Sequence, residues 1–337
     1  MHFYILLVPV ALGSSPLFTA FGDWGDDTKY LAQTIEGLKA QPRPRFVALL
    51  GDNFYSSGVQ SVDDPKFALF DRFSSVSDRF LVVLGNHDYG YAASVKSEIA
   101  YWKKNPKWIM PSRYFLERMY LGNGYSLCAI VLDTHVFDSA QQAWFEQQLI
   151  SCQQSRTFRI VFTHYPMLTV GVYATSGTVS RLRDKILPLI ERYKVHAYLS
   201  GHEHQMQAFE RLGTHFLISG ATAQRNRNAG NDLTKWTREL RYLNAKDVGF
   251  ASFYLSWSDP SVLTYRFINA LDGSTLYQAS LRVGGDSESP VLITPVPQVT
   301  PTVPRAGKTT KTKKPRTSKP KTTGKTSTRT RTTSKTV

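Results

Sequence analysis

The segment FVALLGDNFY at residues 46–55 joins a continuous apolar run to a glycine, an aspartate and a tyrosine. An apolar run of this length is typical of a strand that is covered on both faces of a sheet. The polar side chains follow directly, so Asp52 and Tyr55 are expected where the strand ends. Because groups at strand ends can converge, residues far apart in the sequence can share one site. The segment therefore predicts an α/β fold with a functional site at the edge of its sheet.

Four further motifs of similar composition occur along the chain, and most of them follow an apolar run. They read GDWG (22–25), GNHD (85–88), THYP (163–166) and GHEH (201–204). Each motif alone is weak evidence, because an aspartate after a strand is usually a turn or cap residue. A histidine in that place usually belongs to a loop or to the core. The five motifs together, with glycines that let the backbone turn sharply off each strand, indicate one common site.

The acidic, amide, phenolic and imidazole side chains of these motifs are enough to hold two metal ions. Two-metal centres typically hydrolyse phosphate esters. Trivalent iron prefers anionic oxygen ligands, whereas a divalent ion readily accepts imidazole and amide oxygen. Asp52 is the natural bridge, because one carboxylate can serve both ions. The predicted metal ligands are Asp23, Asp52, Tyr55, Asn86, His164, His202 and His204.

With these motifs the chain resembles the metallophosphoesterase superfamily, and within it the purple acid phosphatases of the small, mammalian-like tartrate-resistant type. Most members of the superfamily carry a ligand histidine where Gly25 stands here, and the purple acid phosphatases use a tyrosine instead, at the place of Tyr55. The resemblance implies Fe(III) held by Asp23, Asp52, Tyr55 and His204. It implies a divalent ion, which is Fe(II), Zn(II) or Mn(II), held by Asp52, Asn86, His164 and His202.

The implied activity is that of an acid phosphatase that hydrolyses phosphate monoesters. Two cations would clamp the phosphate oxygens while a metal-activated hydroxide attacks phosphorus in line. Since metal binding lowers the pKa of water, an acid pH optimum is expected. Asn86 and His87 are the expected substrate-binding residues, with His87 as the catalytic proton donor or, alternatively, a spacer beside Asn86. Asp88 is expected to orient His87 or a metal-bound histidine.

One position departs from the resemblance. The mammalian-like enzymes carry a Glu-His pair after the His-Tyr-Pro motif, and counting from His164 places Tyr173 at the histidine position. Either His87 transfers the proton alone, or the loop at 169–178 is rearranged. Two other functions remain open: a different metallophosphoesterase, such as a phosphodiesterase or protein phosphatase, and a surface-binding protein with weakened catalysis. Gly25 and Tyr55 argue against the first, and the intact ligand set argues against the second.

The wider pattern alternates strands and helices and ends in strands alone. This predicts a layered α/β/β/α sandwich of the metallophosphoesterase type, in a domain at 16–283. Strands are expected at 46–50, 80–84, 126–133, 158–162 and 197–199, and an antiparallel closing portion at 215–219, 250–257, 262–269 and 274–281. Helices are expected at 28–39, 139–150 and 180–193. The helix at 139–150 is expected to be capped by Ser139 and to bury Ala143, Trp144, Leu149 and Ile150. The segment from Tyr89 to Arg113 is expected to be a loop that shapes the substrate entrance.

Both ends of the chain differ from this domain. Residues 1–15 are typical of a signal peptide, and their apolar run is too short to span a bilayer, so no transmembrane segment is expected. Residues 284–337 are typical of a disordered linker and a basic tail rich in Lys and Thr. Twelve Lys or Arg and no acid lie between Arg305 and Val337, so subtracting 12 from the net charge of +15 leaves +3 for the rest. The tail is either a solvated extension or an attachment to a polyanion or anionic surface. Without aromatic residues it is not expected to recognise a nucleic acid sequence.

Two cysteines bear on the compartment. Cys128 and Cys152 are compatible with one disulfide, although Cys128 also fits a buried strand position. The chain contains no sequon for N-glycosylation. The possible disulfide and the expected signal peptide together indicate a secreted protein or one of the secretory or lysosomal compartment.

Overall fold

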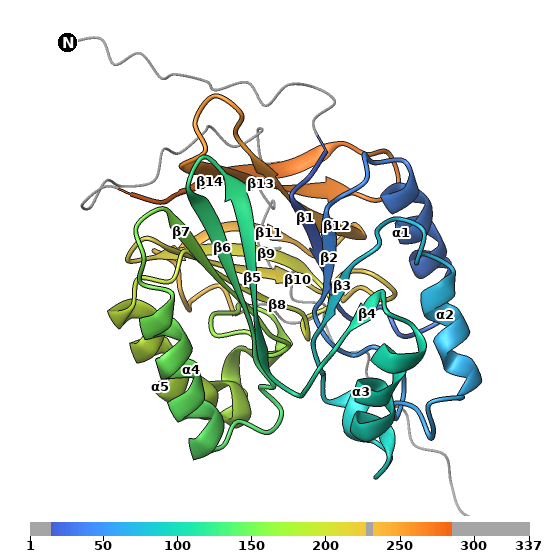
Figure 1. The fold of residues 1–337 in the computed structure, drawn as a ribbon. Coiled ribbons are helices and arrows are strands. Elements are labelled where there is room, and N and C mark those ends of the chain that lie inside the picture. Colours follow the sequence, from blue (N-terminus) through green and yellow to red (C-terminus); the bar gives the residue numbers. More distant parts are fainter. Residues whose placement is uncertain (1–14, 227–231, 285–337) are drawn as a thin grey trace, which may run out of the picture. The chain divides into compact units, whose positions relative to one another are not determined.

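The computed structural model describes residues 15–226 and 232–284, and the structural statements below concern these residues. Within them, two seven-stranded sheets pack against each other, and helices cover the outer face of each sheet (Figure 1). The predicted α/β/β/α sandwich is therefore confirmed. The predicted signal peptide (1–15) and the predicted linker and tail (284–337) lie, apart from their innermost residue, outside the described residues.

The first sheet has the strand order β14-β13-β12-β1-β2-β3-β4. Strands β1 to β4 run parallel to one another, and β12, β13 and β14 continue the sheet in antiparallel fashion. Its strands are β1 (Phe18–Phe21), β2 (Phe46–Leu49), β3 (Phe80–Val82), β4 (Trp108–Ile109), β12 (Gly249–Leu255), β13 (Val262–Asn269) and β14 (Thr275–Arg282).

The second sheet has the strand order β11-β9-β10-β8-β7-β6-β5. Strands β6, β7, β8 and β10 are parallel, while β5, β9 and β11 pair in antiparallel fashion. Its strands are β5 (Phe115–Gly122), β6 (Tyr125–Val131), β7 (Thr157–Phe162), β8 (Ala197–Ser200), β9 (Met206–Arg211), β10 (Thr214–Ser219) and β11 (Leu240–Asn244).

Helices α1, α2 and α3 lie on the side of the first sheet, and α4 and α5 lie on the side of the second (Figure 1). The α-helices are α1 (Lys29–Lys39), α2 (Ala68–Asp71), α3 (Ser94–Lys104), α4 (Ser139–Ser151) and α5 (Gly177–Arg192). Three short 3₁₀ turns accompany them: η1 (Pro65–Phe67), η2 (His87–Tyr89) and η3 (Val172–Thr175). The helix predicted at 180–193 is confirmed in α5, which buries Leu182, Ile186, Leu189 and Ile190.

Aromatic side chains fill the space between the two sheets. The ring of Phe18 stacks on those of Phe46 and Phe253, with centroids 4.9 Å and 4.2 Å apart. It also meets Phe162 of the opposite sheet edge to face at 5.5 Å. Each such pair contributes about 1 kcal/mol beyond the burial of its apolar surface. These contacts help to hold the two sheets together.

Helix α4 differs from its prediction in two details. Its N-terminal cap is Asp138, whose carboxylate accepts the N–H of Gln141 at 2.8 Å, and Ser139 is the first helical residue. The buried residues are Gln141, Phe145 and Leu149, whereas Ala143 and Ile150 are exposed. Burial thus recurs at every fourth residue. The burial of Leu149 is confirmed, and the prediction for Ala143 and Ile150 was wrong. It missed the true buried face because the first of its positions is polar: the Gln141 amide is buried, with its hydrogen bonds made to the loop that precedes the helix.

The segment from Tyr89 to Arg113 was expected to be a loop. This expectation was wrong, because the segment contains α3 and β4. The buried side of α3 consists of Ser94, Ser97, Glu98 and Tyr101. These positions have the spacing of one helix face, but three of the four are polar. A search for apolar periodicity therefore misses this helix.

Two further expectations concern the compartment. Cys128 of β6 forms a disulfide with Cys152, which lies at the carboxyl end of α4. Among the described residues, none of the helices combines the length and the apolar character that a membrane span requires.

Candidate metal centre

Five strand ends bring the motifs to one place. Strands β1, β2 and β3 are parallel within the first sheet, and β7 and β8 are parallel within the second. Each of these five strands is followed within four residues by a predicted ligand. The predicted ligands therefore meet where the carboxyl ends of the two sets of strands face each other. The structure brings all seven of them together, as the following distances show.

A first group of side chains surrounds the phenol oxygen of Tyr55. Its Oη lies 3.1 Å from Oδ1 of Asp23, 3.0 Å from Oδ2 of Asp52 and 3.3 Å from Nε2 of His204. The same nitrogen of His204 lies 3.5 Å from Oδ1 of Asp23. Two ligand atoms that are each about 2.1 Å from one ion are about 3.0 to 3.4 Å apart in octahedral or tetrahedral geometry. The spacing of this group fits a single metal ion.

A second group surrounds Nε2 of His164. This nitrogen lies 3.1 Å from Oδ1 of Asn86, 3.2 Å from Nδ1 of His202 and 3.4 Å from Oδ1 of Asp52. The ligand atoms of Asp52, His164 and His202 all lie within 4.8 Å of one another. The N–H at Nδ1 of His164 donates to the carbonyl oxygen of Leu50 at 2.8 Å, so the ring turns its Nε2 toward the group.

Asp52 belongs to both groups. Its Oδ2 faces Tyr55, and its Oδ1 faces His164. The backbone N–H of His87 also donates to Oδ1, at 3.0 Å. The carboxylate therefore stands between the two groups, which is the place of a bridging ligand.

At three of the strand ends, the backbone turns sharply at the predicted ligand residue itself. Asp23, Asp52 and His202 have positive φ angles of 59°, 54° and 69°. Such angles are rare outside glycine and cluster at functional sites. The preceding glycines mostly serve another need, which is space. A Cβ on Gly85 would lie 2.2 Å from Oδ1 of Asp52, so only glycine fits there.

Buried acids hold the ligand loops from behind. Asp88 accepts the backbone N–H groups of Asn53 and Phe54 at Oδ1 and that of Gly85 at Oδ2. Asp88 therefore orients the loops after β2 and β3. The prediction that it orients a histidine ring was wrong, because these hydrogen bonds come from backbone N–H groups. The amide of Asn53 donates in turn to Oε2 of Glu98 on α3, at 3.1 Å. Burial, together with the charge of Asp52, raises the pKa of Asp88 to about 8.

The electrostatics of the two groups follow from their crowding. Burial and the charges of Asp23 and Asp52 raise the pKa of the Tyr55 phenol far above its usual range. Burial alone would raise the pKa of Asp52, but the charge and hydrogen bond of His164 outweigh it and hold that pKa well below its usual range. For His164, burial lowers the pKa while Asp52 raises it, with a result of about 9. A cation bound here would reverse the effect on Tyr55, because it favours the phenolate.

Two more residues stand beside the groups. The Nδ1 of His87 lies 2.5 Å from the carbonyl oxygen of Ser56, and its Nε2 lies 3.9 Å from Oδ2 of Asp52. The ring of Tyr173 stacks on that of His202, with centroids 3.9 Å apart. The backbone N–H of Tyr173 donates to Oε1 of the buried Glu203 at 2.8 Å, which ties the turn η3 to the segment between the two predicted ligands of the GHEH motif.

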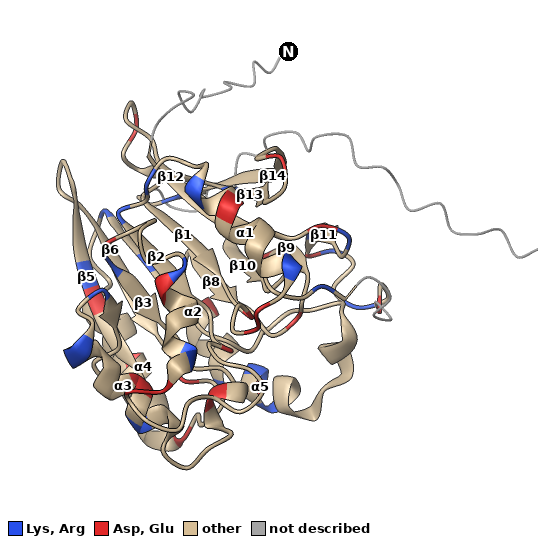
Figure 2. Ribbon diagram, turned by 90° about the vertical axis from the view of Figure 1, so that its right-hand side faces the viewer, with Lys and Arg blue, Asp and Glu red and all other residues tan. Residues whose placement is uncertain are grey.

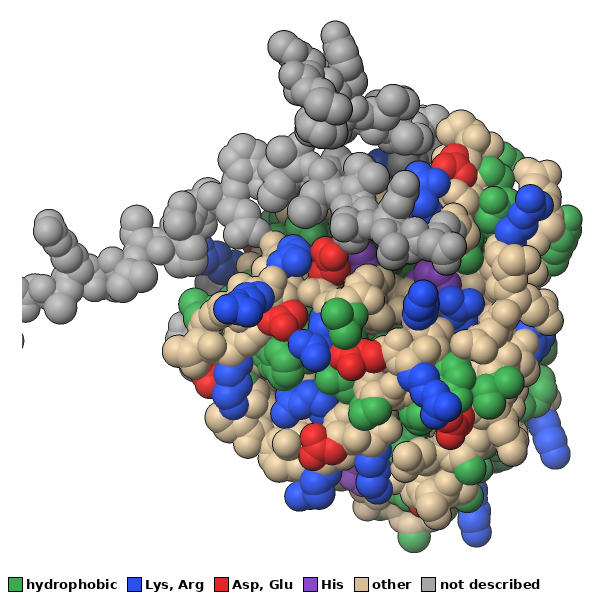
Figure 3. Space-filling model, turned by 90° about the vertical axis from the view of Figure 1, so that its left-hand side faces the viewer, with side chains coloured by type: hydrophobic (Ala, Val, Ile, Leu, Met, Phe, Trp, Pro, Cys, Tyr) green, Lys and Arg blue, Asp and Glu red, His purple; other side chains and the backbone are tan. Residues whose placement is uncertain are grey.

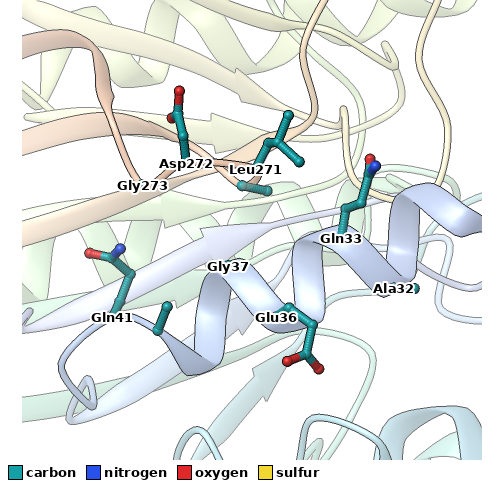
Figure 4. A pocket seen from close by; sticks show the side chains of 10 residues that line it. Ala32, Gln33, Glu36, Gly37, Gln41, Leu271, Asp272 and Gly273 are labelled. Atoms are coloured by element: carbon teal, nitrogen blue, oxygen red, sulfur yellow. The ribbon is translucent and has the colours of Figure 1, made fainter.

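A cavity of about 740 Å³ between α1 and the turn after β13 is separate from this centre (Figure 4). None of the seven predicted ligands lines it. Its charged lining residues are Glu36 and Asp272, and both are acids, which disfavours a phosphate there.

The family of the chain follows from its sequence. The sequence model of the calcineurin-like phosphoesterase family matches residues 16–206, which is more than half of the chain. The chain belongs to this family.

Its curated relatives in this family include acid phosphatases. Tartrate-resistant acid phosphatase type 5 of Oryctolagus cuniculus is 28% identical over 326 residues, which cover 82% of this chain and 94% of the relative. The enzyme of the same name from Homo sapiens is 30% identical over 64% of this chain and 76% of the relative. Purple acid phosphatase 7 of Arabidopsis thaliana is 26% identical over 78% of this chain and 85% of the relative.

Solved structures share the fold. A Plasmodium protein described as GAP50, the anchor in the inner membrane complex, matches with a TM-score of 0.69 and 22% identity over 80% of this chain and 89% of that one. A purple acid phosphatase from yellow lupin seeds matches with a TM-score of 0.58 and 16% identity over 79% of this chain and 53% of that one. At such identities the likeness concerns the fold alone.

Proposed function

We propose that this chain is an acid phosphatase that hydrolyses phosphate monoesters at a binuclear centre of Fe(III) and a divalent ion, Fe(II), Zn(II) or Mn(II). The observation that carries the proposal is the division of seven donor groups into two sets that share Asp52. The set around Tyr55 is rich in anionic oxygens and suits the harder ion, whereas the set around His164 offers an amide and imidazoles. Two such ions, when bound, clamp phosphate oxygens and activate a water molecule.

The residues of the chain supply orientation and a proton. The hydrogen bond from Nδ1 of His87 to the carbonyl oxygen of Ser56 fixes the ring, so that Nε2 faces the Asp52 side. From there His87 contacts the substrate and donates a proton to the leaving oxygen. Asn86 lies beside it and shares in binding the substrate. The ring of Tyr173 stacks on that of His202. In this proposal Tyr173 does not transfer the proton, and His87 does.

Two observations support the setting. The relatives named acid phosphatases agree with hydrolysis of a phosphate ester as the reaction class. The disulfide between Cys128 and Cys152 supports a secreted, secretory or lysosomal protein, because disulfides persist in oxidising compartments.

The proposal is tested by metal analysis together with a panel of phosphate monoesters and diesters, at about pH 5 and about pH 7.5. We expect two metal ions per chain, one of them iron, and preferential hydrolysis of monoesters at the acid pH. Preferential hydrolysis of diesters at the neutral pH would favour another metallophosphoesterase activity. A chain that binds both ions but hydrolyses none of the esters would favour a binding protein with weakened catalysis.

A further inference from the structure

A cavity of about 780 Å³ adjoins the turn η2, which carries His87. The side chain that links the two is Tyr89, which ends the η2 turn carrying His87 and also lines the cavity. The ring of Tyr89 lies 4.5 Å from that of His135. The Nδ1 of His135 lies 3.3 Å from Oη of Tyr165, whose ring is 4.4 Å from that of His202. A short row of rings therefore leads from a predicted metal ligand to the cavity.

The loop that carries His135 is firmly placed. The carboxylate of Asp133 accepts the backbone N–H groups of His135 and Val136, both at 3.1 Å. The hydroxyl of Thr134 accepts the N–H of Tyr165 at 3.0 Å. The loop after β6 is thus tied to the segment that follows His164.

The walls of the cavity are aromatic. Tyr114 packs against Trp144 of α4 with ring centroids 4.9 Å apart. Tyr91 forms a further part of the lining, together with Val95 of α3. Four aromatic rings in one lining favour a planar guest, because aromatic groups prefer stacked or edge-to-face packing with one another.

The charge of the cavity is positive. Its lining contains Lys96 and Arg113 and no carboxylate. Arg113 forms an ion pair with the buried Asp133 at 2.8 Å, so its charge is largely compensated. Lys96 lies exposed on α3, and no ion pair of this side chain occurs among the described residues. Lys96 is therefore the lining cation that is free to meet an anionic guest.

We propose that this cavity is the subsite for the ester group of the substrate, and that it selects a planar group bearing a second negative charge, either a carboxylate or a further phosphate. The inference rests on the proposed function of the neighbouring centre, which would hold the phosphate that is cleaved. The aromatic walls hold the plane of the ester group, and Lys96 meets its charge.

The test compares two non-hydrolysable ligands that differ only in the remote charge, phenylphosphonate and 4-carboxyphenylphosphonate. Their dissociation constants are measured by calorimetry on the metal-loaded full chain. An exposed ion pair is typically worth about a two- to fivefold change in affinity. We expect the carboxylated ligand to bind tighter by about this factor at low salt, and the preference to shrink in about 0.5 M salt.

The variant Lys96→Gln should bring the ratio of the two dissociation constants to about one. The matched control is Lys103→Gln, which removes an exposed charge from the same helix outside the cavity and should keep the wild-type ratio. A wild-type ratio of one, or an unchanged ratio in Lys96→Gln, would overturn the inference. Because binding is measured without turnover, a chain that shows the preference but hydrolyses no ester refutes the proposed function and leaves the subsite standing.

Discussion

Single residues at the candidate centre are constrained by space as much as by chemistry. Gly85 is the sharpest case, since any side chain there meets the Asp52 carboxylate and the backbone N of the same residue at 2.2 Å. The variant Gly85→Ala should displace the carboxylate of Asp52, the proposed bridging ligand, lower the metal content, and lower the free energy of unfolding by about 2 kcal/mol. Metal content and thermal unfolding measure both effects.

The control for this variant is Gly177→Ala at the start of α5. The nearest atom to a Cβ there is a guanidinium nitrogen of Arg181 at 3.4 Å, so the methyl group fits. We expect this control to keep its metal and its stability. Full metal content in Gly85→Ala would show that Asp52 does not need its observed position.

The residues of the centre could be predicted from the sequence to different degrees. The seven donors were predictable because each follows a strand in a short motif, and the structure brings them together. The roles of Glu98 and Glu203 were not predictable. A buried acid is defined by the groups that surround it, and these come from distant segments: Asn53 for Glu98, and Thr169 and Tyr173 for Glu203.

At the scale of elements, α3 acts on the centre through Glu98. Burial, and then the charge of Asp88, raise the pKa of this carboxyl well above its usual value of 4.5. The folded protein therefore keeps a proton that the unfolded chain releases, and the free energy of unfolding falls as the pH rises above about 4.5. The variant Glu98→Gln is neutral at every pH, so its stability should fall less between about pH 4.5 and pH 7.5.

Denaturant unfolding at several pH values checks this prediction. The difference in slope between Glu98→Gln and the wild type is the quantity of interest, so a uniform loss of stability in the variant does not disturb it. Identical slopes would mean that Glu98 is ionised in the folded protein.

The disulfide joins two elements, β6 and α4, and closes a loop with a sequence separation of 24. A cross-link of this kind typically stabilises a protein by about 3 kcal/mol, mainly through the unfolded state. The double variant Cys128→Ser, Cys152→Ser should lose about this much in denaturant unfolding. A reducing agent should lower the stability of the wild type but not that of the double variant. Equal stability of the wild type and the double variant, with and without the reducing agent, would show that the disulfide does not stabilise the fold.

Elements with continuous apolar runs were predictable, as β2 and β3 show. Elements whose buried side is polar were not, and α3 with Ser94, Ser97 and Glu98 is the clearest case. Strand β5 was missed for a related reason. It pairs with one neighbour at the edge of its sheet and alternates buried, half-buried and exposed positions without a regular period.

At the scale of the whole molecule, the described part and the basic tail differ in their balance of charged residues. Lys and Arg are interspersed with Asp and Glu along the described ribbon (Figure 2). On the face seen from the side of α4 and α5 both signs also occur, and Lys and Arg predominate (Figure 3). Outside residues 305–337 the net charge is +3, which is small beside the twelve positive charges of the tail. Attachment to a polyanion through the tail stays a prediction, since the tail lies outside the described residues.

Two histidines of the second-sheet side, the buried His215 of β10 and the half-buried His196 just before β8, make the folded protein sensitive to acid. Burial lowers the pKa of His215 to about 4, and burial together with the charge of Arg159 lowers that of His196 to about 3. The unfolded chain takes up these protons first, near pH 6.5, so the free energy of unfolding falls as the pH falls below about 6.5. His215 alone accounts for a loss on the order of 3 kcal/mol by about pH 4.

The variant His215→Gln isolates this effect, because a glutamine keeps a polar partner for the hydroxyl of Tyr265. Its free energy of unfolding should depend less steeply on pH between about 4 and 6.5. An unchanged dependence would show that His215 is not the group that takes up the proton.

The central claim is that Tyr55 binds iron within a pair of metal ions, and a visible absorption spectrum with metal analysis tests it most directly. A phenolate bound to Fe(III) absorbs visible light, so the wild type should be purple to pink. The variant Tyr55→Phe, which removes only the oxygen, should lose this band. A colourless, iron-free wild type that hydrolyses phosphate monoesters at full rate would contradict the account.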